Sequence, residues 1–260
     1  MRIAAVQLRS GSDTVENLAQ VERWARQAAE GGAELVVFPE ATMKAFGTGR
    51  LDHAAEPLDG PFATRVQQLA ESLGVVIVLG MFTPADEHNG KRRIYNTALI
   101  TGPGLHRGYR KMHTYDAFGF RESDTVKPGD ELVTFPLGGA TVGVAVCFDV
   151  RFPSQFQDLA RAGAEVIVLP ASWSGGEGKI AQWQLLTVAR ALDSTAFVVA
   201  CDQAAPVGND PGDAPVGVGH SAIIGPTGVR IVEAGEEEEI IYADVDLEHV
   251  ERVRGVIPVL

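Results

Sequence analysis

Short apolar runs alternate with amphipathic stretches along this chain, and that alternation restricts its fold more than any other feature. Eight runs have the Val- and Ile-rich composition of strands that are buried on both faces: 2–8, 34–38, 75–81, 95–100, 141–148, 165–170, 196–202 and 220–225. Four stretches with helical periodicity lie among them: 14–30, 61–74, 153–162 and 179–194. Asp13 or Thr14 can cap the first helix, and Pro61 suits the first turn of the second. A β-α-β order requires crossover connections, so we expect an α/β fold with helix-covered sheets.

The second half of the chain repeats the first. The segment "GGAELVVFPE" at 31–40 is echoed by "AGAEVIVLPA" at 162–171, and "RIAAVQL" by "TVGVAVC". This likeness favours two similar β-α halves. If their sheets pack together, the helices lie outside and the strand ends gather at one rim.

Three chemically capable residues follow strand ends. Glu40 follows "LVVFP", Lys111 lies in "YRKMHTYD" and Cys147 ends "VGVAV". They are 71 and 36 positions apart, so only the fold could bring them together. When the two halves are aligned by these repeated segments, Glu40 corresponds to Ala171 and Cys147 corresponds to Gln7. The two halves therefore place different side chains at the same rim. Each residue alone also has an ordinary explanation: a helix-start carboxylate, a surface lysine and a small buried side chain.

Composition excludes several classes of function. The chain has 260 residues, of which 45% are hydrophobic and 22% charged, as in globular proteins. Its net charge of −12 repels phosphate backbones, and the one compact basic cluster, 91–93, is explained as a solvated loop. We therefore expect no nucleic-acid partner. Two cysteines are too few for a disulfide framework, and no signal peptide or membrane span is visible, so we expect a soluble, cytoplasmic protein with reduced thiols.

Three segments together carry a resemblance to a known family: "FPE" at 38–40, "YRKMH" at 109–113 and "GVAVCFDVRFP" at 143–153. They look like the signature regions of the nitrilase superfamily of carbon–nitrogen hydrolases. Supporting segments run nearly end to end, among them "YNTALI", "KPGD", "LPASW" and "GHSAIIGPTG". The resemblance implies one domain over 1–260, built as a four-layer α-β-β-α sandwich with a Glu-Lys-Cys triad. It also implies a homodimer or a higher homo-oligomer.

The resemblance assigns a role to each candidate. Cys147 would attack an amide or nitrile carbon and form a thioester, with Lys111 providing a field that favours the thiolate. Glu40 would be the general base. Lys111 and the backbone N–H of Phe148 would stabilise the oxyanion. Glu122, in "FGFRES", resembles a second glutamate that many members carry, although a surface pairing with Arg121 would also explain it.

Further residues are expected to shape the site. We select Tyr115, Ser172 and Trp173 as substrate-binding candidates. After the nucleophile, Asp149 and Arg151 are expected to form an ion pair that shapes the turn. A similar buried pairing is expected between the side chains at positions 190 and 193, an arginine and an aspartate.

Other mechanisms have less support in the sequence. The six histidines show no metal-ligand spacing, and we expect neither a metal nor a cofactor. His113 could assist Cys147, but the lysine motif explains the same region better. The segment "SGGEGK" lacks the P-loop pattern, and no G-x-S-x-G motif supports a serine hydrolase.

Within the superfamily, the motifs most resemble small amidases that hydrolyse ω-amides of 2-oxoacids, or the amidase that acts on deaminated glutathione. We therefore expect ammonia release from a small carboxylated amide and an Arg or Lys near the pocket, in 172–179 or in the Pro- and Gly-rich loop 203–218, which could be a lid. An N-carbamoyl amino acid hydrolase of the β-ureidopropionase type and a true nitrilase remain alternatives. A catalytically silent scaffold is the alternative from a different class.

Overall fold

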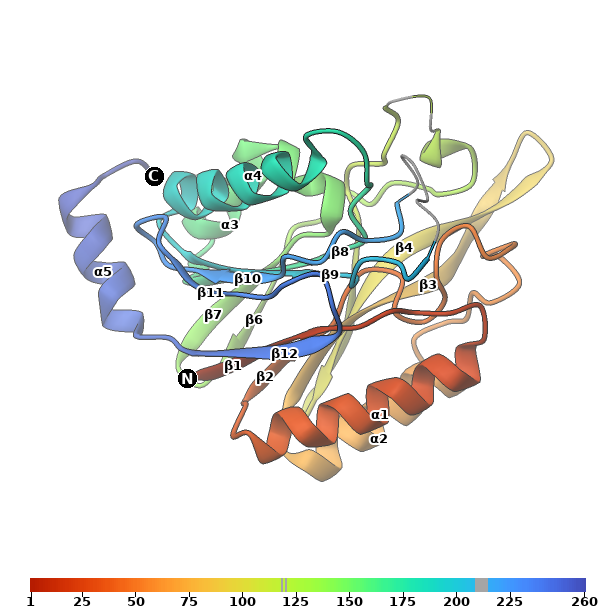
Figure 1. The fold of residues 1–260 in the computed structure, drawn as a ribbon, viewed down its shortest axis with the longest axis horizontal. Helices are drawn as coiled ribbons and strands as arrows, with labels where there is room; N and C mark the ends of the chain where they lie inside the picture. Colours follow the sequence, from red (N-terminus) through yellow and green to blue (C-terminus); the bar gives the residue numbers. More distant parts are fainter. Residues whose placement is uncertain (118, 120, 209–214) are drawn as a thin grey trace.

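Two mixed β-sheets lie face to face, with helices on their outer sides (Figure 1). The computed structural model describes residues 1–117, 119, 121–208 and 215–260, and in that part of the chain each sheet has six strands. The first sheet contains, in spatial order, β12 (Glu239–Asp244), β1 (Arg2–Gln7), β2 (Leu35–Val37), β3 (Val76–His88), β4 (Lys91–Gly102) and β5 (Leu105–Arg110). The second contains β6 (Val133–Leu137), β7 (Ala140–Val144), β8 (Val166–Ala171), β9 (Phe197–Asp202), β10 (Ala222–Ile224) and β11 (Arg230–Glu233).

The two sheets have the same topology, which confirms the two similar halves. In each sheet three parallel strands lie in the middle, namely β1, β2 and β3 in one and β7, β8 and β9 in the other. The other pairings between these described strands are antiparallel. The crossover helices are α1 (Thr14–Glu30) and α2 (Pro61–Leu73) in the first half and α3 (Pro153–Arg161) and α4 (Lys179–Ser194) in the second. The result is the expected α-β-β-α sandwich.

Strand β1 shows why its sequence suits the middle of this sandwich. Ile3 and Ala5 pack between the two sheets, whereas Ala4 and Val6 pack against the helices. Because both faces are covered, the strand is apolar at successive positions. The first helix begins as expected, because the Asp13 side chain accepts hydrogen bonds from the amides of Val15 and Glu16 in its first turn.

The structure corrects several predicted element boundaries. The strand expected over 141–148 ends at Val144, and the turn η2 (Cys147–Arg151) follows, because Cys147 adopts a left-handed φ of 47° that a strand cannot continue. Strands β3 and β4 are longer than predicted. They form a hairpin whose turn residues, Asn89 and Gly90, both have positive φ, as a two-residue hairpin turn requires.

Five elements were missed in the sequence: β5, β6, β11, β12 and the helix α5 (Leu247–Val256), which lies beyond the end of the sandwich in Figure 1. No described helix combines the length and apolar character needed to cross a bilayer.

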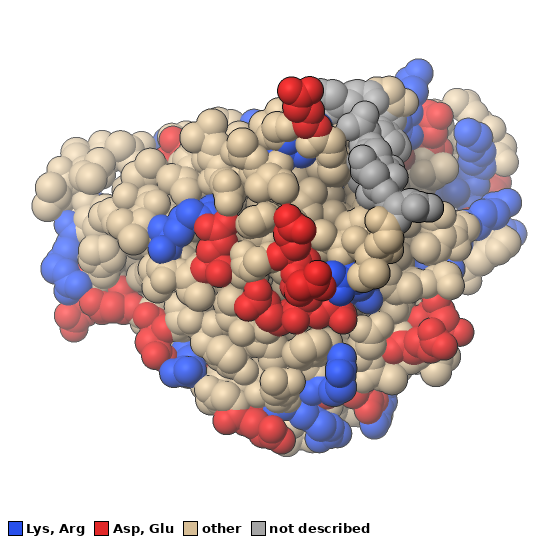
Figure 2. All heavy atoms as spheres, viewed as in Figure 1, with Lys and Arg blue, Asp and Glu red and all other residues tan. Residues whose placement is uncertain are grey.

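The face drawn in Figure 2 carries a gathering of acidic side chains near its middle, with Lys and Arg side chains scattered around it. This distribution agrees with the net charge of −12.

Candidate active site

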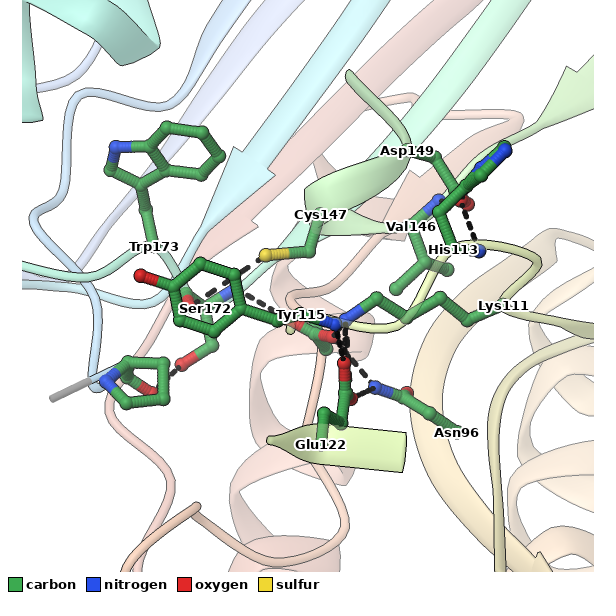
Figure 3. A network of polar contacts seen from close by, with 12 residues as sticks. Asn96, Lys111, His113, Tyr115, Glu122, Val146, Cys147, Asp149, Ser172 and Trp173 are labelled. Carbon is green, nitrogen blue, oxygen red and sulfur yellow. Dashed lines mark hydrogen bonds and ion pairs between the residues drawn. The ribbon is translucent and has the colours of Figure 1, made fainter. Parts of the chain in front are cut away.

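The three predicted residues meet at one rim of the sandwich, where strands of both sheets end. Glu40 lies three residues beyond the end of β2, and Lys111 follows β5 directly. Cys147 begins the turn η2, three residues beyond the end of β7. Figure 3 shows the side chains of Lys111 and Cys147 together with those that surround them.

Glu40 is held by three donors in a fully buried position. Its Oε1 accepts from Lys111 Nζ at 3.0 Å and from Asn96 Nδ2 at 2.7 Å. Its Oε2 accepts from the amide of Ser172 at 2.9 Å, so the carboxylate also bridges the two sheets. These contacts leave the side chain a single orientation.

The second glutamate contacts the same lysine. Glu122, in the short turn η1 (Glu122–Asp124), places Oε2 3.0 Å and Oε1 3.2 Å from Lys111 Nζ (Figure 3). Its Oε2 also accepts from the amide of Tyr115 at 2.5 Å. The side chain of Arg121 points to Asp124 instead, at 4.0 Å. Glu122 therefore joins Glu40 and Lys111 in one cluster, and the alternative surface pairing with Arg121 is not formed.

Cys147 presents its sulfur to a cavity. The side chain is 8% exposed, and Sγ lies 3.8 Å from the carbonyl oxygen of Ser172, to which it donates. The left-handed φ of Cys147 turns the chain sharply, so that the amide of Phe148 follows the Cys147 thiol at the same rim. Backbone strain of this kind gathers at functional sites.

Burial and the charges within the cluster shift the pKa values of its ionisable side chains. Burial raises the pKa of the Glu40 carboxyl above its ordinary value, and the charge of Lys111 only partly opposes this. Burial lowers the pKa of Lys111, but the charges of Glu122 and Glu40 outweigh it and hold that pKa well above the ordinary value. Burial, followed by the charge of Glu40, raises the pKa of the Cys147 thiol well above its usual range despite Lys111.

The charge of Lys111 acts on Cys147 in the expected direction, towards the thiolate. Burial and the charge of Glu40 outweigh it, so the thiol is favoured at rest. A thiol at rest needs a base at the moment of attack. Glu40 stands close enough for its charge to act on the pKa of Cys147.

The cavity above the cluster measures about 320 Å³. Glu40, Lys111, Glu122 and Cys147 all border it, and its other lining residues are largely apolar: Phe46, Leu51, Val126, Phe148, Trp173, Pro215 and Val216. Two cationic side chains, Arg121 and Arg151, also border it. Such a cavity suits a small molecule with one polar end.

The three substrate-binding candidates all border this cavity. Tyr115 packs edge-on against the ring of Phe148, with ring centres 5.2 Å apart. Ser172 donates its hydroxyl to the carbonyl of Pro215 at 2.7 Å, and Trp173 is fixed by its amide, which donates to Asp202 at 2.8 Å.

The expected lid lies partly outside the described residues. Positions 209–214 of the 203–218 stretch are not described, whereas Pro215 and Val216 border the cavity. Arg121 and Arg151 border the cavity but lie outside 172–179 and 203–218, the two segments in which we expected a cationic side chain.

The ion pair predicted just after Cys147 is wrong. Asp149 is fully buried and points toward Tyr109 and His113, whereas Arg151 points toward the cavity and donates to Gln182 at 2.7 Å. Residues two apart in a tight helical turn do not face each other, which explains the difference. The pairing expected at positions 190 and 193 is confirmed, at 2.7 Å, but the aspartate is 35% exposed rather than buried.

Asn96 is a site residue that the sequence did not reveal. Its amide nitrogen donates to Glu40 at 2.7 Å and to Glu122 at 3.2 Å, so it links the two glutamates. A buried amide in the otherwise apolar run "YNTALI" was the available signal. Among the described residues, no group of three or more His, Cys, Asp or Glu side chains is placed to hold a metal ion.

Comparison with known proteins agrees with this geometry. The family model described as carbon–nitrogen hydrolase matches residues 2–255. The chain belongs to the carbon–nitrogen hydrolase family. It is therefore an enzyme that hydrolyses carbon–nitrogen bonds, as the resemblance implied.

Individual relatives of this carbon–nitrogen hydrolase align nearly end to end. A protein described as a hydrolase in Mycobacterium tuberculosis is 46% identical, over 100% of this chain and 94% of its own length. A zebrafish (Danio rerio) omega-amidase is 34% identical, over 99% of this chain and 92% of its own. The human omega-amidase is 32% identical, over 99% and 93%.

Solved structures confirm the nitrilase-type fold. Nit3 of Saccharomyces cerevisiae, a member of branch 10 of the nitrilase superfamily, superposes with a TM-score of 0.81 at 29% identity, over 99% of this chain and 94% of that one. The NitFhit protein of Caenorhabditis elegans gives a TM-score of 0.86 at 26% identity, over 99% and 63%.

Proposed function

We propose that this protein is a thiol-dependent amidase that releases ammonia from a small carboxylated amide. The observation that carries the proposal is the buried cluster of Glu40, Lys111 and Glu122 beside the sulfur of Cys147, at the base of a cavity of about 320 Å³. The omega-amidase relatives support the choice of an amide as substrate.

The reaction begins when the Cys147 sulfur attacks the amide carbon while Glu40 takes the thiol proton. Because the thiol is protonated at rest, attack and proton transfer are coupled. Negative charge that develops on the amide oxygen is stabilised by Lys111 and the N–H of Phe148. Glu40 then passes its proton to the leaving nitrogen, the carbon–nitrogen bond breaks, ammonia leaves and a thioester remains.

Hydrolysis of the thioester uses the same base. Glu40 takes a proton from a water molecule, whose oxygen attacks the thioester carbon. The carbon–sulfur bond breaks, Glu40 returns the proton to the sulfur, and the carboxylic acid leaves. Glu122 keeps Lys111 charged throughout, because its carboxylate contacts Nζ through both oxygens.

The position of Arg151 supports the proposal that the substrate carries a carboxylate at the end far from the scissile amide. Arg151 borders the cavity, its guanidinium lies over the ring of Trp173 with its central carbon 5.2 Å from the ring centre, and one of its donors, Nε, is buried without a hydrogen-bond partner in the described part of the chain. A carboxylate oxygen would satisfy such a donor. Tyr115, Ser172 and Trp173 would shape the space between this end and the scissile amide.

The same proposal extends to the state of the protein. We propose one domain over 1–260 that works in the cytoplasm as a homodimer. Both cysteines are free, which suits a reducing compartment. Apolar side chains exposed on α4 and near the C-terminus, including Leu185, Leu192 and Val256, suit burial against a second copy. Light scattering coupled to size exclusion tests the dimer.

The decisive experiment replaces the nucleophile. Cys147→Ala should abolish ammonia release and remove the acyl-enzyme seen by intact-mass measurement after rapid acid quenching. Cys201→Ala is the matched control, because that thiol is buried among backbone carbonyls and should leave turnover intact. Turnover by Cys147→Ala would disprove the proposal.

A substrate panel separates the alternatives. Ammonia release should be fastest from ω-amides such as succinamate. Faster turnover of N-carbamoyl amino acids or of nitriles would select the carbamoylase or nitrilase alternative instead. Failure with every compound, together with an unreactive Cys147, would favour a catalytically silent scaffold.

A further inference from the structure

One buried carboxylate next to the nucleophile accepts four hydrogen bonds. Asp149 Oδ2 accepts from Tyr109 Oη at 2.6 Å and from the amide of Val146 at 2.8 Å. Its Oδ1 accepts from the amide of His113 at 3.0 Å and is 2.8 Å from Nδ1 of the same residue. Because a carboxylate only accepts, Nδ1 carries a proton.

These four donors come from both catalytic segments. Tyr109 and His113 lie two residues before and two residues after Lys111, and Val146 directly precedes Cys147. Figure 3 shows Asp149 between the backbone at Val146 and the ring of His113. One side chain therefore ties the lysine-bearing segment to the nucleophile turn, although the two are far apart in the sequence.

We propose that Asp149 and His113 form a positioning pair that sets Lys111 against Cys147, an inference that rests on the proposed function. Neither residue borders the cavity, so neither is placed to touch the substrate. Their effect runs through the geometry of Lys111 and Cys147. Misplacing catalytic groups by about 1 Å costs roughly 100-fold in rate.

His113 is the member of the pair that can be substituted without opening the core. Its ring stacks on that of Phe152, with centres 3.5 Å apart and planes 9° apart, and its side chain is 27% exposed. The stack fixes the plane of the ring, and this plane points Nδ1 at Asp149. Substitution at 113 can thus remove one donor without opening the core.

The experiment compares two substitutions at this position. His113→Leu removes the Nδ1 donor and keeps an apolar side chain against Phe152. His113→Asn keeps a donor near the position of Nδ1. With succinamate as the substrate, His113→Leu should lower kcat by about 10- to 100-fold with KM within about twofold, and His113→Asn should restore most of the rate.

A second measurement needs no substrate. The rate of Cys147 alkylation by iodoacetamide, located by peptide mapping, should fall several-fold in His113→Leu and recover in His113→Asn, because a displaced Lys111 no longer favours the thiolate. Thermal denaturation verifies that both variants are folded at the assay temperature.

Three results would overturn the positioning role. His113→Leu could lower the Tm but leave kcat and alkylation unchanged, it could raise KM alone, or His113→Asn could lose as much rate as His113→Leu. A parallel assay of Cys147→Ala keeps the two proposals separate. If that variant is inactive while His113→Leu is fully active, only the positioning role fails, whereas activity in Cys147→Ala refutes the proposed function itself.

Discussion

Gly80 is the residue on which the placement of Glu40 depends most directly. It lies in β3, beside the turn that carries the glutamate, with its amide donating to Pro39 and its carbonyl accepting from Met43, both at 2.9 Å. A Cβ at this position would stand 2.4 Å from the amide nitrogen of Ala41 and 2.6 Å from the Cα of Glu40. Both are backbone atoms, so no side-chain rotation can relieve the contact.

Gly80→Ala should therefore displace the glutamate. Normal contact between such atoms is about 3.5 Å, so the turn must move by about 1 Å. A shift of that size costs roughly 100-fold in kcat/KM, and overpacking costs about 1–3 kcal/mol of the free energy of unfolding.

Steady-state ammonia release and denaturant titration measure the two effects. Gly225→Ala is the matched control, because its added Cβ meets nothing nearer than 3.6 Å and its φ is not left-handed, so it should change neither quantity appreciably. If Gly80→Ala is folded and its kcat/KM stays within about threefold of the wild type, the position of Glu40 does not limit the rate and the reasoning is refuted.

Three further changes test the charges around the site. Glu122→Gln removes a charge that raises the pKa of Lys111, so the alkaline limb of the kcat/KM profile should move to lower pH; an unmoved limb would contradict this role. Burial raises the pKa of the Asp202 carboxyl to about 7, so the folded protein favours its protonated form. The contribution of this group to the free energy of unfolding is therefore lost as the pH rises from about 4, the ordinary pKa, through 7. Asp202→Asn should therefore lose less stability over that interval than the wild type, as measured by urea unfolding, and parallel curves would exclude the effect. Arg151→Met should raise KM for succinamate by about tenfold or more and leave KM for a neutral amide such as butyramide within about twofold; equal effects on both would argue against carboxylate binding.

The sequence predicted the elements that have strong local patterns. The apolar runs and capped helices of the two halves were identified because burial on both faces and helix ends leave local signals, as at Asp13. The strand ends in turn placed Glu40 and Cys147 at one rim. Strands such as β6 and β11 are short and lie at sheet edges, where one-dimensional patterns are weak.

The remaining features depend on contacts between distant segments. Asn96 joins two glutamates 56 and 26 positions away, and nothing near it in the chain indicates either partner. Asp149 was paired with Arg151 because the two are close in sequence, yet its partners are 40 and 36 positions earlier. The pKa of Cys147 could not be foreseen either, because the balance of burial against Lys111 depends on how completely the fold excludes water.

Because the backbone at Cys147 is left-handed, the residue that would give the highest thermal stability at this position differs from the one that turnover requires. A residue with a Cβ pays about 1 kcal/mol to stay in that conformation, whereas glycine adopts it freely. A selection for thermal resistance alone would therefore favour glycine at this position and discard the thiol that we propose as the nucleophile. Directed evolution of a hardier variant should couple each round of heating to a screen for ammonia release.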